Sequence, residues 1–366
     1  MSNLIKSTEF DRQMIRRCVD LAKQGWGRTA PNPLVGAVIV IDGEIVGEGF
    51  HPGVGQPHAE VFALRQAGGK ATGATIYVSL EPCNHYGRTP PCAAALVAAG
   101  VVKVVVGMVD PNPLVAGGGI KTLEQAGIEV IVGVETDLCA ELNEGFVQRI
   151  VHHRPLGILK YAMTLDGKIA TDSGQSRWVS SEPSRQYVHH LRAGCDAVII
   201  GGNTLRRDNP HLTSHDPIAP NPLRVVMTRK LDLPTEAILW DTSVVPTLVV
   251  TQTGANPIIR DLLIDRGVEV LELDLLSPKL VMQHLFDRGC LSVLWECGGT
   301  LAASAIADGA IQKVLAFVAP KIVGGLSAPS PVGDMNIRSM SDALVLERVS
   351  YQQIGTDFLI QGYVGS

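Results

Sequence analysis

The sequence is poor in aromatic residues and contains no long hydrophobic run. Phe, Trp and Tyr make up only 5% of its 366 residues, whereas hydrophobic residues make up 46%. No apolar stretch approaches the roughly 20 residues that a membrane-spanning helix requires. Residues 1–17 carry scattered charges instead of the apolar core of a signal peptide. This composition predicts an α/β protein without a membrane partner.

Cysteine and positive charge are also scarce. Seven cysteines, an odd number dispersed through the chain, do not resemble a disulfide framework, so we expect the reducing cytoplasm. Lys and Arg number 31 against 36 Asp and Glu, which gives a net charge of -5. Because nucleic-acid binding usually needs a basic face, this charge argues against a nucleic-acid partner and favours a small-molecule substrate.

The length and pattern of the chain predict two domains. The first is expected over residues 1–150 and ends in a helix over 137–150. Residues 151–155, Val-His-His-Arg-Pro, are charged, aperiodic and end in proline, which is typical of a linker. In residues 156–366 apolar strands alternate with helices again. This alternation predicts a largely parallel sheet that binds ligands at the carboxyl ends of its strands.

A metal-binding pattern lies between residues 57 and 92. His58 and Glu60 are expected to open one helix, Cys83 follows an apolar strand, and Cys92 lies near the start of the next helix. One imidazole and two thiolates supply three zinc ligands and leave a fourth position for water, as in catalytic zinc sites. Glu60 is placed to carry a proton from that water. The pattern resembles the H-x-E and P-C-x-x-C signature of zinc deaminases, although eight residues instead of two separate the cysteines.

A closed structural zinc site is the alternative interpretation of this pattern. It would need a fourth protein ligand, for which His51 and His85 are available. Such a site would have no use for Glu60, so we favour the catalytic interpretation.

Two features of the second half suggest a nucleotide site. A strand ending near Glu296 leads through Gly298 and Gly299 into a helix, and the free amides of such a helix can bind phosphate. The second feature is the segment 160–178, which by itself indicates only a strand followed by a turn. Either signal alone is weak.

Together, residues 57–92, 160–178, 202–213 and 296–304 resemble the bifunctional deaminase/reductase family of riboflavin biosynthesis, and the resemblance covers nearly the whole chain. It implies a cytidine-deaminase-like α/β/α sandwich followed by a dihydrofolate-reductase-like α/β domain. It also implies Zn²⁺ in the first domain and NADPH in the second. The implied reactions are hydrolytic deamination of a diaminopyrimidine ribotide derived from GTP, then reduction of its ribosyl side chain to ribityl. A homo-oligomer is implied as well.

The resemblance also implies roles for single residues of the second domain. The implied NADPH contacts are Ala162, Trp178, Thr204, Asp208, Gly298, Gly299, Thr300, Leu301, Ala302, Ala303 and Ser304. The implied substrate contacts are Ser176, Arg192, Leu212 and Glu296, with Lys160 in the same cleft.

Two positions depart from the pattern of the family. His215 stands where the family usually has an arginine for the substrate phosphate, and Arg229 stands where a small polar residue is expected. We expect Arg229 to meet the 2′-phosphate of the cofactor, as arginines do in other NADP sites.

Two other functions stay open at this point. One is a deaminase of another small nucleoside or nucleotide, joined to an inactive reductase-like domain. The other is a zinc-stabilised module in which both halves only hold ligands.

Overall fold

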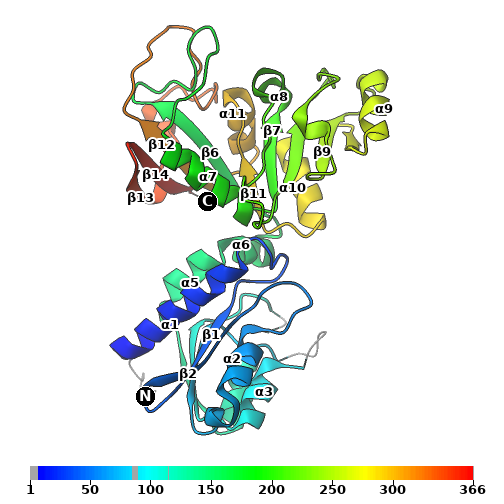
Figure 1. Ribbon diagram of the computed structural model, residues 1–366. Coiled ribbons are helices and arrows are strands. Elements are labelled where there is room, and N and C mark those ends of the chain that lie inside the picture. The colour runs from blue at the N-terminus through cyan, green and yellow to red at the C-terminus, as the bar shows by residue number, and fades with distance from the viewer. Residues whose placement is uncertain (1–6, 85–89, 114, 366) are drawn as a thin grey trace. The chain divides into compact units, whose positions relative to one another are not determined.

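The computed structural model describes residues 7–84, 90–113 and 115–365. The chain divides into two compact units, Met1–His153 and Arg154–Ser366 (Figure 1). Among the described residues, no helix is long and apolar enough to cross a membrane.

The first unit contains a five-stranded sheet in the order β2-β1-β3-β4-β5. Its strands are β1 (Gly36–Ile41), β2 (Glu44–Phe50), β3 (Thr75–Leu80), β4 (Lys103–Met108) and β5 (Glu129–Val132). Strands β1 and β2 form an antiparallel hairpin, and β3, β4 and β5 are parallel. The hairpin turns at Asp42-Gly43, where both residues have positive φ, as a two-residue hairpin loop requires.

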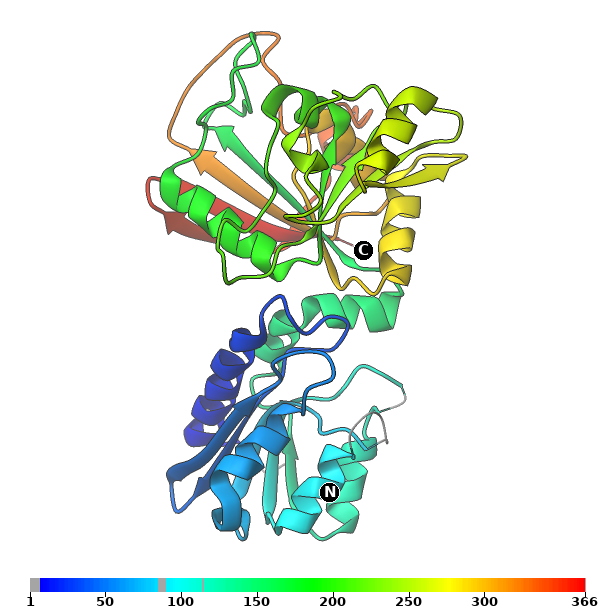
Figure 2. The same cartoon turned by 45° about the vertical axis from the view of Figure 1, so that its right-hand side comes forward.

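Helices cover both faces of this sheet. Alternate residues of β1 point to opposite faces: Ala37 and Ile39 belong to one buried cluster, whereas Val38 and Val40 belong to the other. The first cluster includes α2 (Ala59–Ala67), α3 (Cys92–Ala99) and α4 (Gly118–Gln125), and the second includes α1 (Glu9–Ala22) and α5 (Thr136–Leu142). In Figure 1 and Figure 2, α1 in dark blue and α3 in cyan lie on opposite sides of the sheet. The predicted α/β/α sandwich is confirmed.

The end of the first unit differs from the sequence prediction. The single helix expected over residues 137–150 is broken at Asn143, whose side chain accepts from Leu34 N (2.8 Å) and donates to Leu34 O (2.9 Å). The second piece, α6 (Glu144–His152), continues through two residues expected in the linker. It ends at His153, whose φ of 52° is left-handed. Helical hydrogen bonding therefore extends further than composition indicated.

The second unit contains a nine-stranded sheet in the order β10-β9-β8-β7-β11-β6-β12-β14-β13. Its strands are β6 (Leu156–Thr164), β7 (Ala197–Gly201), β8 (Leu223–Met227), β9 (Thr247–Gln252), β10 (Glu269–Leu273), β11 (Ser292–Trp295), β12 (Lys313–Ala319), β13 (Leu346–Ile354) and β14 (Asp357–Val364). The first seven strands in this spatial order, from β10 through β9, β8, β7, β11 and β6 to β12, are parallel to one another. Strands β14 and β13 continue the sheet in antiparallel pairing. The predicted largely parallel sheet is confirmed by these seven strands, and the sequence prediction did not include the terminal antiparallel hairpin.

Two hydrophobic clusters lie on the two faces of this sheet. One includes side chains of α7 (Glu182–Gly194), α8 (Gly202–Asp208) and α9 (Pro257–Asp265), and the other includes α10 (Pro278–Asp287) and α11 (Gly299–Ala307). The 3-10 turns are Lys23–Gly25, Gly68–Ala71, Ile238–Trp240 and Met340–Asp342. Because β8, β7, β11 and β6 are neighbours and parallel, the segments that follow them meet at one edge of the sheet.

Candidate functional sites

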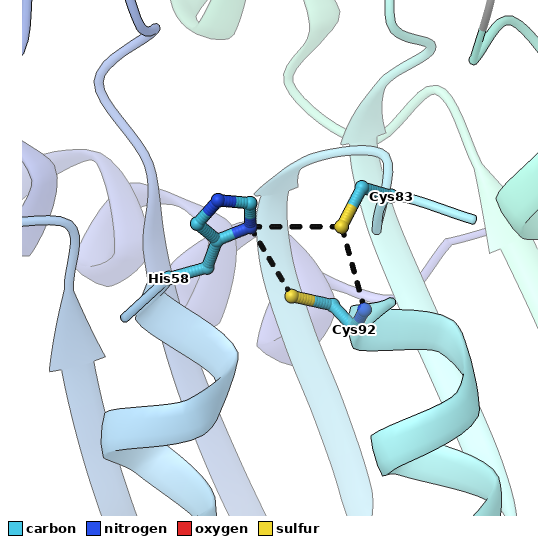
Figure 3. Close-up of side chains that lie close together, drawn as sticks. All are labelled: His58, Cys83 and Cys92. Atoms are coloured by element: carbon cyan, nitrogen blue, oxygen red, sulfur yellow. Dashed lines mark hydrogen bonds between the residues drawn. The ribbon is translucent and has the colours of Figure 1, made fainter. Parts of the chain in front are cut away.

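Three side chains from separate elements of the first unit converge (Figure 3). His58 Nδ1 lies 3.3 Å from Cys92 Sγ and 3.6 Å from Cys83 Sγ, and all three potential ligand atoms lie within 4.8 Å of one another. The backbone N–H of Cys92 also donates to Cys83 Sγ over 3.4 Å. This is the only such cluster of metal-ligating side chains within the described ranges.

Local structure explains why these side chains meet. His58 is the N-cap of α2, Cys92 is the first residue of α3, and Cys83 lies in the loop after β3. The N-terminus of a helix stabilises negative charge, so Cys92 stands where a thiolate is favoured. Two cysteine sulfurs and one imidazole nitrogen are ligands that zinc prefers in proteins.

Glu60 lies in the first turn of α2 and is 2% exposed. Its Oε2 atom is buried without a hydrogen-bond partner among the described residues. Burial raises the pKa of Glu60 to about 6, although the nearby His58 acts in the opposite direction. A buried carboxyl group with one unpartnered oxygen is suited to accept and release a proton.

His51, which we considered as a fourth ligand, is engaged elsewhere. Its Nδ1 donates to Pro57 O over 3.1 Å, and its Nε2 therefore accepts from Asn32 Nδ2, also over 3.1 Å. Burial lowers the pKa of His51, which favours this neutral form. The other candidate, His85, lies outside the described residues. The sequence patterns gave no indication that Asn32 would hold His51.

Three charged side chains that are largely shielded from solvent form a cluster in the second unit. Arg192 of α7 forms two hydrogen bonds to Glu296, which follows β11, with Nε to Oε1 at 2.6 Å and NH2 to Oε2 at 3.1 Å. Lys160 Nζ of β6 lies 3.7 Å from Glu296 Oε2. Burial disfavours the charged carboxylate, but the two cations outweigh this effect and lower the pKa of Glu296 to about 2. Three residues expected in the substrate site are thus brought together.

The loop that contains Leu212 and His215 joins this cluster. Arg192 NH1 donates to Thr213 O over 3.1 Å, which fixes the loop beside the ion pair. The His215 ring lies 4.2 Å from the His189 ring and 5.9 Å from that of His211, measured between ring centroids. The two additional histidines were missed, because their positions in the sequence carry no spacing signal.

Ser176 and Trp178 line a separate cavity, together with Thr164 and Lys321. Lys321 Nζ donates to the backbone oxygen of Trp178 over 2.7 Å. Arg177 NH2 donates to Asp208 O over 2.8 Å, so α8 is tied to the same segment.

The remaining expected cofactor contacts lie along the edge formed by parallel strands. Ala162 is near the end of β6, Thr204 is in α8 directly after β7, and the exposed Arg229 follows β8. The stretch Gly298–Ser304 forms the N-cap and most of α11 after β11. A Cβ atom at Gly298 would meet nothing within 4 Å, whereas one at Gly299 would lie 2.7 Å from Ser330 O. Space is therefore open beside Gly298 at the N-terminus of α11, and a helix N-terminus with open space beside it fits a phosphate-bearing cofactor.

Comparison with known proteins identifies the family. The RibD C-terminal domain matches residues 155–360, and the cytidine and deoxycytidylate deaminase zinc-binding region matches residues 8–108. A riboflavin biosynthesis protein RibD from Synechocystis is 60% identical, with 97% of this chain and 96% of the relative covered. The chain belongs to the RibD family.

Two solved structures are similar over nearly their full length. Acinetobacter baumannii RibD has a TM-score of 0.86 and 41% identity and covers 98% of this chain and 99% of its own. A Thermotoga maritima diaminohydroxyphosphoribosylaminopyrimidine deaminase/5-amino-6-(5-phosphoribosylamino)uracil reductase has a TM-score of 0.84 and 34% identity and covers 97% and 99%.

Membership of the RibD family establishes the general function. The protein is a bifunctional enzyme of riboflavin biosynthesis, with a hydrolytic deaminase activity and a reductase activity on a small-molecule substrate. Its cofactors are Zn²⁺ and NADPH. The alternatives of an inactive reductase-like domain and of a binding module are not favoured.

Proposed function

We propose that the first unit deaminates diaminohydroxyphosphoribosylaminopyrimidine and that the second reduces the resulting 5-amino-6-(5-phosphoribosylamino)uracil to its ribityl form. The name of the Thermotoga maritima relative supports both substrates. The observation that carries the proposal is the convergence of His58, Cys83 and Cys92 near a buried glutamate, one oxygen of which has no hydrogen-bond partner among the described residues. The two reactions are consecutive, because the product of the first unit is the substrate of the second.

In the first unit, we assign His58, Cys83 and Cys92 as the zinc ligands and Glu60 as the proton carrier. Bound zinc supplies Lewis acidity that lowers the pKa of water towards 7. Glu60 takes one proton from the attacking water and delivers it to the ring nitrogen. It then takes the remaining proton of the added hydroxyl group and delivers it to the amino group, which departs as ammonia. Its burial keeps bulk water from competing for this proton.

In the second unit, we assign the backbone N–H groups at the start of α11, beginning at Gly298, to the phosphates of NADPH, which supplies the hydride. Ala162, Trp178, Thr204, Asp208 and the rest of the stretch to Ser304 complete the cofactor site. Arg192, Glu296 and Lys160 orient the sugar through fixed charges, with Ser176, Leu212 and His215 beside them. These groups position the two reactants, and positioning is the main contribution that a hydride transfer needs from the protein.

The cellular setting is proposed on weaker but specific grounds. None of the seven cysteines forms a disulfide in the described part of the chain, which supports the cytoplasm, and the net charge of -5 supports the absence of a nucleic-acid partner. Tyr351 and Phe358 of the β13–β14 hairpin are 81% and 52% exposed, and apolar groups on one hairpin support a homo-oligomer.

One experiment tests the order of the reactions. Zinc-loaded protein receives the diaminopyrimidine ribotide, ammonia is measured, and NADPH is then added while its absorbance is followed. We expect ammonia release without NADPH and then one NADPH oxidised for each ammonia released. Ammonia without NADPH oxidation would contradict the reductase assignment, and the absence of both would contradict the substrate.

A further inference from the structure

Glu81 lies between the end of β3 and Cys83, and it is 4% exposed. Its carboxylate accepts hydrogen bonds from four backbone N–H groups of the segment 110–120. Two of these donors contact Oε2 and two contact Oε1. The donors are Asp110 N (3.2 Å) and Gly117 N (2.9 Å) to Oε2, and Gly119 N (2.9 Å) and Ile120 N (3.2 Å) to Oε1.

The same segment packs closely against both neighbours of Cys83. A Cβ atom added to Gly119 would lie 1.8 Å from Pro82 O, and one added to Gly118 would lie 2.1 Å from Asn84 Nδ2. Both distances are far below van der Waals contact. The Pro82 backbone on one side of Cys83 and the Asn84 side chain on the other therefore contact the start of α4, and the Glu81 carboxylate bonds these two segments together.

We propose that Glu81 is a positioning residue of the zinc site, which fixes Cys83 through the start of α4. This inference rests on the proposed role of Cys83 as a zinc ligand. Zinc sites require ligand distances within roughly 0.2 Å, so movement of the Cys83 backbone weakens metal binding. Charge-assisted hydrogen bonds are about twice as strong as neutral ones, and four of them converge here. A glutamine at this position would present an NH₂ group to two N–H donors.

The test uses the full-length protein with Glu81→Gln, and Glu48→Gln as the matched control. Glu48 is also a hydrogen-bonded carboxylate of the first unit, paired with Arg17 at 2.7 Å. Zinc affinity is measured by competition with a chromophoric chelator, and the Co²⁺-substituted protein gives a thiolate–metal absorption spectrum. For Glu81→Gln we expect zinc affinity to fall about tenfold or more. We also expect a shifted Co²⁺ spectrum and a lower kcat of deamination. The reductase activity of Glu81→Gln should be unchanged. In Glu48→Gln the zinc affinity, the Co²⁺ spectrum and both activities should equal those of the wild type.

A second pair of variants covers the case in which Glu81→Gln disrupts the first unit. Gly119→Ala forces the same two segments apart without removing a charge, and Gly69→Ala adds a Cβ where nothing lies within 4 Å. We expect weaker zinc binding in Gly119→Ala and none of this effect in Gly69→Ala. Wild-type zinc affinity and Co²⁺ spectrum in both Glu81→Gln and Gly119→Ala would overturn the inference. Wild-type zinc affinity in Cys83→Ser would instead show that Cys83 is not a ligand, and the zinc-site assignment under the proposed function would then be wrong.

Discussion

Two buried glutamates, one in each unit, differ in the partners that surround them. Glu60 is 2% exposed and its Oε2 atom has no hydrogen-bond partner in the described part of the chain, so burial raises its pKa to about 6. The side chain of Glu296 is 11% exposed, but Arg192 and Lys160 overcome the cost of its partial burial and lower its pKa to about 2. The pKa of one glutamate is therefore shifted up and that of the other is shifted down, because only Glu296 has cationic partners.

The difference matches the chemistry of the two units. A proton carrier must be able to exchange its proton near neutral pH, which a buried carboxyl group without a cationic partner to hold it ionised can do. A group that orients a substrate through charge must keep one charge state, and paired cations provide this. In the first unit burial raises the pKa of a proton carrier, whereas in the second unit an ion pair keeps a carboxylate ionised. The predictions below test this contrast.

The largest expected effect is the loss of one activity alone. Cys83→Ser should lose zinc and all measurable deamination, because a hydroxyl is a much poorer zinc ligand than a thiolate. Reduction of the deaminated intermediate should continue at the wild-type rate. Metal content and both activities provide the measurement, and Cys139→Ala, which alters a buried cysteine of α5, is the control. Loss of both activities would show that the units are not independent.

Glu60→Gln should separate catalysis from metal binding. Loss of the proton carrier is expected to lower kcat of deamination by about 10² to 10⁴-fold. Zinc content should be unchanged, since the three ligands remain. The measurement is ammonia release at saturating substrate alongside metal analysis. Deamination at the wild-type rate would mean that another group carries the proton.

These two predictions concern residues that the sequence already marked, and the reason is local. His58, Glu60, Cys83 and Cys92 lie within 35 positions, at helix starts and a strand end, so spacing alone predicts that they meet. The cluster of the second unit is different: Lys160, Arg192 and Glu296 come from distant parts of the chain, and only the strand order brings them together. Resemblance supplied their roles, but no spacing could supply the ion pair.

Some features could not be predicted from local pattern at all. Asn143 interrupts a periodic helix because its amide bonds to a distant backbone group. Glu81 precedes the Pro-Cys pair, but its four N–H donors lie between 29 and 39 residues further on. In β14, Asp357, Phe358, Leu359 and Ile360 alternate between buried and exposed. Because Phe358, Leu359 and Ile360 are all apolar, the sequence shows no matching alternation of apolar and polar residues.

Acid should expose the contrast as a difference in stability. Because the folded pKa of Glu296 lies below its ordinary value of 4.5, the ionised group stabilises the fold above about pH 4.5, and this contribution is lost as pH falls towards 2. A shift of this size corresponds to about 3 kcal/mol. In Glu296→Gln this part of the acid dependence should disappear.

Urea unfolding between pH 5 and pH 2 measures this effect, and tryptophan fluorescence reports it because Trp178, Trp240 and Trp295 lie in the second unit. The control is Glu272→Gln, which removes a more exposed carboxylate 3.5 Å from Arg260. It should retain the wild-type acid dependence. The same slope in wild type and Glu296→Gln would show that the ion pair contributes no net stability.

The smallest expected effect concerns an exposed charge. Arg229 follows β8 at the cofactor edge, and solvent screens its charge, so its contact with the 2′-phosphate should contribute about 1 kcal/mol at most. Arg229→Ala should therefore raise KM for NADPH by about fivefold. KM for NADH, which lacks this phosphate, should not change. Steady-state kinetics with both cofactors make the measurement, and Lys230→Ala removes the neighbouring exposed cation as a control. An equal rise in KM for both cofactors would place Arg229 near a group that they share.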